Sequence, residues 1–447
     1  MLAGGDMPDV FLGGIDANTI TMNYELFAKL NDLLPKYAPN VLNYYEKNNT
    51  EWKKLLTYPD NNIYTLMGGF YTNYQNLVNG LGWINQVWLK NVGLEAPKTI
   101  DDLYNVLKAF KNNDANKNGD PNDEIPLDFA EKYWCASIYN YLCTWGITGD
   151  YNIKNGKVIP TMNTDAYRKY LEYFNKLYKE ELINPEGFSQ TGDQYIASNK
   201  AMKQGIFYMW APQTNLEGKL ASEYIPLGKI TAPGFEDEYA YPSNYKIVAN
   251  TTAFCISESS KNKEAALRWW DYLSSTDELR MLTARGIEGY TWKFGEDGKV
   301  YAFVSTPEEK TALIKKYGLA SEYNNTLSYA SFYLDNFHPL IMENMSYRPP
   351  KEGEYASPGY ARQLAIDGLH DSLAPEAMPK NIVPADYQEK LDFTCEGLKD
   401  YISRFLADSI MKGVTDESWN EYLNKLKEYN YDFHIEFYQN KFDNTFE

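Results

Sequence analysis

Hydrophobic residues recur at a helical spacing in several parts of the chain. The clearest case runs from Thr164 to Tyr178, where apolar and aromatic side chains fall on one face at a period of about 3.6 residues. Another begins at Thr99, with Asp102 at the capping-box position ahead of a second apolar helical face. Together these patterns predict helices over residues 23–36, 99–111, 134–145, 164–178 and 259–273, and a mainly helical last hundred residues.

Short apolar runs between turn residues predict strands elsewhere in the chain. We expect strands within residues 10–12, 61–69, 207–210 and 247–257. Lys154–Lys157 contains an Asn-Gly pair typical of a two-residue hairpin turn, and Asp297-Gly298 favours a second hairpin over residues 292–303. Because strands and helices alternate along the chain, the predicted fold class is α/β.

Length and charge narrow the classes of protein that this chain can represent. At 447 residues it is too long for one hydrophobic core, so we expect two lobes or domains. The net charge of -18 argues against binding to nucleic acid or to an anionic membrane surface, since both need clustered Lys and Arg. No uninterrupted apolar window of about 18 residues is present, so no membrane-spanning helix is predicted.

Aromatic residues are unusually frequent, with 39 Tyr and 10 Trp. Most aromatic side chains are buried in the hydrophobic core. They also stack on the apolar faces of sugar rings, so their excess is a weak indication of carbohydrate binding.

The cysteines and histidines give no indication of catalysis. The four cysteines have no CxxC and no metal spacing with the three dispersed histidines. A disulfide between Cys135 and Cys143 is one alternative, and buried free thiols are the favoured one. No nucleophile elbow, zinc-protease motif, P-loop or dinucleotide fingerprint appears.

One polar stretch, residues 114–127, has the pattern of a calcium-binding loop. Oxygen-bearing side chains alternate along its first half, and Gly119 allows the sharp turn of an EF-hand-like D-x-N-x-N-G sequence. Ile125 occupies the position where the standard loop has its closing Glu. The carboxylates that could close this loop come one and two positions earlier, at Glu124 and Asp123. The candidate ligands of a structural Ca²⁺ are Asp114, Asn116, Asn118, Asp120, Asp123 and Glu124, with Asn122 an alternative to the last two. The alternative is an Asx-rich surface turn that binds no ion.

Several stretches in the same order along nearly the whole chain resemble the extracellular solute-binding proteins (family 1) that serve ABC sugar importers. They are Gly5–Val10, Trp83–Leu94 with Pro97–Thr99, Asn262–Gly289, and the tail from Gly413 to Gln439. The loop at 114–127 is similar to the calcium loop of the alginate-binding and LplA-like branch of that family, although it looks one residue longer than the commoner form.

The resemblance implies a two-lobed, type II-like periplasmic-binding-protein fold with a hinge and a helical carboxyl-terminal part. The chain would cross between the lobes more than once. We therefore place lobe one at residues 1–85 plus 250–300, and lobe two, with the calcium loop and the last helices, at residues 86–249 plus 301–447.

The resemblance also implies a function and a location. Members capture a carbohydrate, here expected to be an oligosaccharide, and deliver it to the membrane permease of an ABC importer. We expect a monomeric, extracellular, cell-surface lipoprotein that is not an enzyme. Family members begin with a lipoprotein signal, a lipidated cysteine and a first strand–helix unit, which do not precede Asp9–Leu12 here, so we expect the natural protein to extend beyond Met1.

A sugar site needs flat rings against apolar sugar faces and a few polar groups for hydroxyls. Trp210 ends a strand-like run, where binding residues often lie. Trp88 is more simply explained as core, and so is at least one of Trp269 and Trp270. The candidate ligand-binding residues are Trp210, Glu288, Tyr290, Trp292, Trp83, Trp134, Asp16 and Asn18.

Two other functions fit parts of the sequence. An oligopeptide-binding importer component would share the architecture and use the same aromatic residues differently. A glycoside hydrolase would need two carboxylates at a set separation, and 61 acidic residues supply many pairs without marking one.

Overall fold

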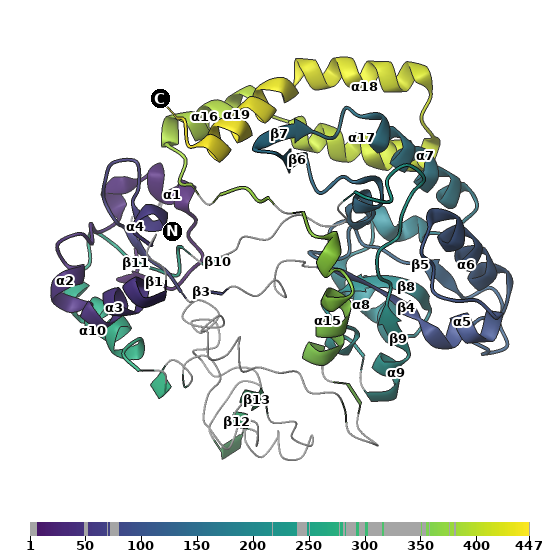
Figure 1. Ribbon diagram of the computed structural model, residues 1–447, viewed down its shortest axis with the longest axis horizontal. Helices are drawn as coiled ribbons and strands as arrows, with labels where there is room; N and C mark the ends of the chain where they lie inside the picture. The colour runs from purple at the N-terminus through teal and green to yellow at the C-terminus, as the bar shows by residue number, and fades with distance from the viewer. Residues whose placement is uncertain are drawn as a thin grey trace.

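The computed structural model describes residues 7–48, 52–68, 70–71, 80–216, 218–238, 248–249, 251–276, 278–279, 282, 292–294, 300–302, 315–316, 350, 355–356, 358–374, 376–379 and 381–446. These residues form two bodies, each with its own hydrophobic core, which lie on opposite sides of Figure 1. No helix in these ranges is long and apolar enough to cross a membrane. All four cysteines are free thiols, as favoured from the sequence.

The first body is built around a three-stranded antiparallel sheet whose central strand comes from far along the chain. β11 (Phe254–Ile256) lies between β1 (Val10–Phe11) and β2 (Thr65–Leu66). Its helices are α1 (Ala17–Thr21), η2 (Tyr24–Leu26), α2 (Leu34–Tyr37), α3 (Pro39–Asn48), α4 (Trp52–Leu56) and α10 (Lys263–Leu273).

The second body contains a four-stranded sheet with the order β5-β8-β4-β9. The strands are β4 (Leu81–Asn85), β5 (Ile125–Leu127), β8 (Gln204–Met209) and β9 (Tyr224–Pro226). β8 runs parallel to β5 and antiparallel to β4, and every residue of β4 and β8 is buried. This sheet therefore forms the centre of the larger core.

Helices cover the sheet of the second body (Figure 1). They are α5 (Gln86–Val92), α6 (Ile100–Asn112), η4 (Ile138–Trp145), α7 (Asp165–Lys179), η5 (Pro185–Phe188), α8 (Gly192–Lys200), η6 (Pro212–Thr214) and α9 (Gly218–Ser222). Local signals set several of their ends: Thr99 and Asp102 form the predicted capping box of α6, and Thr164 accepts a hydrogen bond from the Tyr167 N–H at the start of α7.

The chain passes between the two bodies three times. β3 (Phe70–Tyr71) follows β2, and β10 (Val248–Ala249) precedes β11; the two strands pair antiparallel, so the first two connections run side by side. A third connection leaves α10 and continues to α15 (Pro358–Asp367). Within it β12 (Trp292–Phe294) pairs antiparallel with β13 (Val300–Ala302), which confirms the predicted hairpin.

The last helices belong mainly to the second body. They are η7 (His370–Ser372), α16 (Ala385–Thr394), α17 (Leu398–Lys412), α18 (Asp416–Glu428) and α19 (Tyr431–Asp443). α17 packs on α7, where the buried Asn175 amide donates to the Ile410 carbonyl at 2.8 Å. α19 packs on the predicted hairpin of β6 (Tyr151–Lys154) and β7 (Lys157–Pro160). α16 reaches the first body, where Asn18 of α1 donates to Gln388 at 3.3 Å.

Three sequence predictions about local structure are wrong. Residues 23–36 do not form one helix, because the backbone N–H groups of Ala28 and Leu30 donate to the carbonyls of Ile256 and Ile63 instead of to their own turn. The helix predicted over 134–145 begins only at Ile138 and is a 3₁₀ helix. The strand expected within 247–257 is divided between β10 and β11, which lie in different sheets.

The predicted boundary between the lobes at residue 85 stays a prediction. Leu81, Trp83 and Ile84 of β4 nevertheless pack in the core of the second body, together with residues from 361–431. β4 pairs on both sides with strands of that body, so it belongs with the residues that follow it.

Candidate functional site

Trp210 lies directly after β8, at the end of the sheet of the second body. Its side chain is half-buried and packs against the core. Arg362 of α15 is only 3% exposed; its guanidinium carbon lies 4.9 Å from the Trp210 ring centroid, and its Nη1 donates to the Trp210 carbonyl at 3.1 Å. Arg362 therefore fixes both the backbone and one ring face of Trp210.

Trp134 is presented at the tip of a short closed loop, residues 130–137. The Ala130 N–H donates to the Ala136 carbonyl at 2.9 Å and closes the loop. The Glu131 carboxylate accepts hydrogen bonds from the Ser137 hydroxyl at 2.8 Å and the Ile138 N–H at 3.1 Å, and burial raises the pKa of this carboxyl. The Trp134 side chain is 56% exposed, which is unusual for so large an apolar group.

Cys135 brings Trp134 and Trp210 to the same edge of the second body. Its buried thiol makes a hydrogen bond with the Trp210 backbone and contacts the Met209 sulfur at 3.8 Å, and burial raises its pKa to about 12. A Cβ added to Gly80 would stand only 2.0 Å from the Cys135 carbonyl oxygen. The chain entering β4 thus packs directly beneath the loop that carries Trp134.

Trp83, a third candidate, does not reach the surface. It is 0% exposed, and its indole N–H donates to the Met209 carbonyl at 3.0 Å. β4 is an inner strand with both faces covered, so the side chain is core in this structure, and its contact with a ligand stays a prediction.

Asp16 and Asn18 lie on the first body, at the start of α1. The Asp16 carboxylate caps this helix by accepting from the Thr19 N–H at 2.6 Å, and Asn18 makes the contact with Gln388 of α16 described above. Both side chains therefore have structural partners, and their contact with a ligand stays a prediction.

Three candidates from the third connection cannot be placed. Glu288 and Tyr290 lie outside the described residues. The backbone of Trp292 is described as the first residue of β12, but its side chain lies outside the described part.

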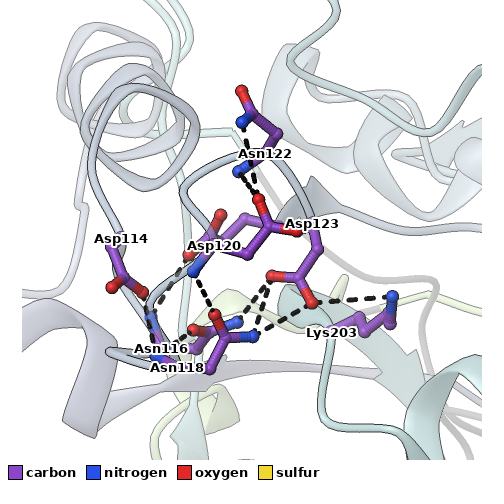
Figure 2. A network of polar contacts seen from close by, with 8 residues as sticks. Asp114, Asn116, Asn118, Asp120, Asn122, Asp123 and Lys203 are labelled. Carbon is purple, nitrogen blue, oxygen red and sulfur yellow. Dashed lines mark hydrogen bonds and ion pairs between the residues drawn. The ribbon is translucent and has the colours of Figure 1, made fainter.

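The predicted metal loop is a compact network of Asx side chains and backbone N–H groups (Figure 2). The two oxygens of Asp114 accept from the N–H groups of Asn118 at 3.0 Å and Gly119 at 2.9 Å. The side-chain amide oxygen of Asn116 accepts from the Asn118 N–H at 2.9 Å, and that of Asn118 accepts from the Asp120 N–H at 2.7 Å. Gly119 has a φ of +93°, which favours glycine at this turn.

Two acidic residues close the loop and differ in their surroundings. Burial opposes ionisation of Asp123, but hydrogen bonds from the Asn116 and Asn118 amides and the nearby Lys203 ammonium hold the pKa of its carboxyl below the usual value. Burial raises the pKa of Glu124, whose Oε2 is buried and has no hydrogen-bond partner among the described residues.

The donor set of this loop fits a hard cation. It combines carboxylate and amide oxygens, the ligands that Ca²⁺ prefers, and the orphaned Glu124 oxygen lacks a partner that a cation would supply. Within the described ranges, no group of three or more His, Cys, Asp or Glu side chains is arranged to hold a metal. The side-chain amide oxygens of Asn116 and Asn118 would therefore have to complete the set of ligands beside the carboxylates.

Two residues that are central to this body were not among the predicted site residues. Asp128, directly after β5, is 0% exposed and accepts from the amides of Asn184, Gln190 and Gln204 at 2.7, 2.9 and 2.5 Å. The contact of Arg362 with Trp210 was not predicted either, because the two residues are distant in sequence. A polar residue directly after a buried strand was the one available signal for Asp128.

Comparison with known proteins shows what this chain is similar to. It is 26% identical over 467 residues to the fructooligosaccharide ABC transporter substrate-binding protein FusA of Streptococcus pneumoniae, covering 99% of this chain and 81% of the relative. The structure of FusA with kestose has a TM-score of 0.79 at 23% identity, and covers 99% of this chain and 89% of FusA. An EF-hand mutant of FusA has a TM-score of 0.77 at the same identity and coverage.

The alginate-binding protein AlgQ2, in a structure without calcium ion, has a TM-score of 0.64 at 18% identity, covering 99% of this chain and 87% of AlgQ2. These matches confirm the α/β, two-lobed fold of periplasmic solute-binding proteins. The family model for bacterial extracellular solute-binding proteins matches residues 1–279, more than half of the chain, in agreement with the resemblance found in the sequence. This chain therefore belongs to the family of bacterial extracellular solute-binding proteins.

Proposed function

We propose that this protein is the substrate-binding component of an ABC importer and captures an oligosaccharide between its two lobes. Support comes from its family and from the match to FusA over 99% of the chain, in a relative named for fructooligosaccharides. The protein then presents its ligand to a membrane permease, as a monomer and without chemical turnover. It acts outside the cell, held at the surface by a lipid anchor.

The observation that carries this proposal is the pair Trp134 and Trp210, held at one edge of the second body around Cys135. Arg362 occupies one face of the Trp210 ring, so only the other face is left for a sugar. Trp134 is held at the tip of a closed loop and is more than half exposed. Two aromatic side chains fixed in this way can stack on successive sugar rings with little loss of conformational entropy on binding.

The other face of the site comes from the first lobe and the third connection. Asp16 and Asn18 on α1 and Glu288, Tyr290 and Trp292 in the connection are the proposed contacts there. The lobes are those predicted from the sequence, residues 1–85 plus 250–300 and residues 86–249 plus 301–447, except that β4 (Leu81–Asn85) is assigned to the second lobe because of its packing. The paired strands β3 and β10 lie where two of the connections cross, so bending about them would close the lobes on the ligand.

We propose further that the loop at 114–124 holds a structural Ca²⁺. Asp114, Asn116, Asn118, Asp120, Asp123 and Glu124 would supply its oxygens, and the orphaned Glu124 Oε2 supports the assignment. Bound calcium would offset the negative charge of the carboxylates that lie along the loop between the end of α6 and the start of β5. The ion would thus stabilise the second lobe and have no direct contact with the sugar.

A thermal-shift panel tests the carbohydrate assignment. Purified protein is mixed with kestose, nystose, alginate oligosaccharides, other oligosaccharides and a set of oligopeptides, each from micromolar to millimolar concentration. Because a ligand that binds only the folded state raises Tm, one class of oligosaccharide should raise it in a concentration-dependent way. A response to peptides alone would replace the sugar by a peptide, and cleavage products in the same mixtures would refute a purely binding function.

The calcium assignment has its own test. Chelation with EGTA should lower the Tm of the free protein and Ca²⁺ should restore it, with Mg²⁺ at the same concentration as the control. A Tm that does not respond to chelator or Ca²⁺ would remove calcium from the proposal and leave the sugar assignment unaffected.

A further inference from the structure

Lys203 contributes an ammonium to the loop from outside it. This residue lies between α8 and β8, about eighty positions after the loop, and its Nζ is 3.5 Å from Asp123 Oδ2 (Figure 2). Among the ion pairs of the described residues, it is the one that joins a basic side chain to residues 114–124. The candidate calcium loop therefore already has a positive charge at one of its carboxylates.

We propose that Lys203 is a tethered cation that competes with calcium for Asp123 and thereby sets the calcium affinity of the loop. This inference rests on the proposed calcium site. In the metal-free loop, the ammonium neutralises part of the carboxylate charge that gathers there. When Ca²⁺ binds, the ammonium must give up Asp123 or remain beside a doubly charged ion.

The backbone of Lys203 is fixed relative to the loop, whereas its side chain extends partly into solvent. Its carbonyl accepts from the Ile125 N–H at 2.7 Å, and Ile125 pairs with the next residue, Gln204, in the parallel ladder of β5 and β8. The side chain is 46% exposed, whereas that of Asp123 is 21% exposed. The ammonium can therefore swing into water without any change in the backbone, but it cannot move far from the bound ion.

The size of the effect follows from the charges. A single positive charge held roughly 6 Å from a doubly charged ion in a water-like medium weakens binding of the ion by about tenfold, and less when the side chain moves outward. Salt screens this repulsion over about 10 Å at 0.1 M ionic strength. Lys203 should thus lower calcium affinity by roughly three- to tenfold at low salt, and by less at high salt.

The experiment measures calcium affinity by calorimetric titration of CaCl₂ into the full chain at low and at 0.5 M NaCl. Lys203→Gln removes the charge and Lys203→Arg keeps it. Lys157→Gln, at the exposed first residue of β7, changes the net charge equally in a strand that does not pair with β5 or β8. We expect Lys203→Gln to bind calcium roughly three- to tenfold more tightly at low salt, with Lys203→Arg and Lys157→Gln within about twofold of wild type.

A second measurement separates competition from a structural role. The Lys203 end of the ion pair is nearly half exposed, and such a pair contributes little to folding, so the Tm of the EGTA-treated Lys203→Gln variant should match that of wild type. Its Tm increase on adding a fixed Ca²⁺ concentration should be larger. Equal calcium affinities of wild type and Lys203→Gln, or an equal gain in Lys157→Gln, would overturn the inference. Absence of calcium binding in wild type itself would refute the calcium site together with it.

Discussion

Replacement of Asp128 separates the need for a hydrogen-bond acceptor from the need for a charge in the second body. Oδ1 of this buried carboxylate accepts from Asn184 and Gln190, and Oδ2 accepts from Gln204. Asp128→Ala removes both acceptor oxygens, and with them all three hydrogen bonds, at once. Asp128→Asn keeps the shape and one acceptor but places an amide N–H₂ where Gln204 now donates.

The structure gives a different cost for each variant. In Asp128→Ala, three buried amide groups each lose a hydrogen bond to the carboxylate, at about 1–3 kcal/mol each. Because Gln190 Nε2 still donates to the Phe129 carbonyl, the free energy of unfolding should fall by about 3–5 kcal/mol after relaxation. In Asp128→Asn, the side-chain amide of Gln204 can rotate, because its Oε1 is buried and has no hydrogen-bond partner among the described residues. That oxygen then accepts from the new amide, so the loss should stay within about 1 kcal/mol.

Urea unfolding followed by tryptophan fluorescence measures both variants, at several pH values. Burial raises the pKa of Asp128 above its unfolded value, although the three amide donors act in the opposite direction. The stability that this carboxyl contributes is therefore fully present below its unfolded pKa and is lost as the pH rises through its folded pKa. The difference in the free energy of unfolding between Asp128→Asn and wild type should therefore favour the variant more at pH 7 than at pH 4.

The reasoning fails if Asp128→Asn is as unstable as Asp128→Ala at neutral pH. That result would mean that the negative charge itself holds the three amides together and that Gln204 does not reorient. Asn184→Ala provides a reference, since it leaves the carboxylate with two of its three donors, and it also removes the Asn184 oxygen that accepts from the Glu186 N–H.

Three further predictions concern other parts of the chain. Trp134→Ala should weaken binding of the sugar found in the panel by roughly tenfold or more, with the Tm of the free protein unchanged because the side chain is 56% exposed; unaltered affinity by calorimetry would exclude it from the site. Gly80→Ala places a Cβ 2.0 Å from the Cys135 carbonyl and should cost about 3 kcal/mol or abolish folding in a urea titration, whereas a neutral effect would contradict the close packing there. Burial lowers the pKa of His434, so its stability contribution is present above an unfolded pKa of about 6.5 and is lost as the pH falls below it; the Tm of His434→Gln should fall less than that of wild type between pH 7 and pH 5, and parallel curves would refute this.

Local patterns predicted those elements whose hydrogen bonds stay local. The capping box at Thr99, the Asn-Gly turn of the β6–β7 hairpin and the apolar face of α7 were all legible in sequence, because each depends on residues a few positions apart. The helix predicted over residues 23–36 is wrong because the same apolar spacing also fits an extended segment. That segment forms a hydrogen bond with Ile256, which is more than two hundred residues away.

The candidate site was predictable to a similar extent. The metal loop is a continuous stretch, and its polar side chains do converge in a single network. Trp83 could not be separated from Trp134 by sequence, because burial of the first depends on β8 and β9 pairing on either side of β4. Arg362 and Lys203 reach Trp210 and Asp123 from distant segments, so no local pattern marks them.

The position of β11 between β1 and β2 also determines the order in which the chain can fold. During synthesis, the first three-stranded sheet lacks its central strand until residue 256 has been made. The larger core likewise lacks α17, which packs on α7, until residues 398–412 emerge. Contacts of such long sequence separation make folding slow. A chain of this family, which works outside the cell, therefore remains incompletely folded until nearly all of it has been synthesised, which suits export before folding.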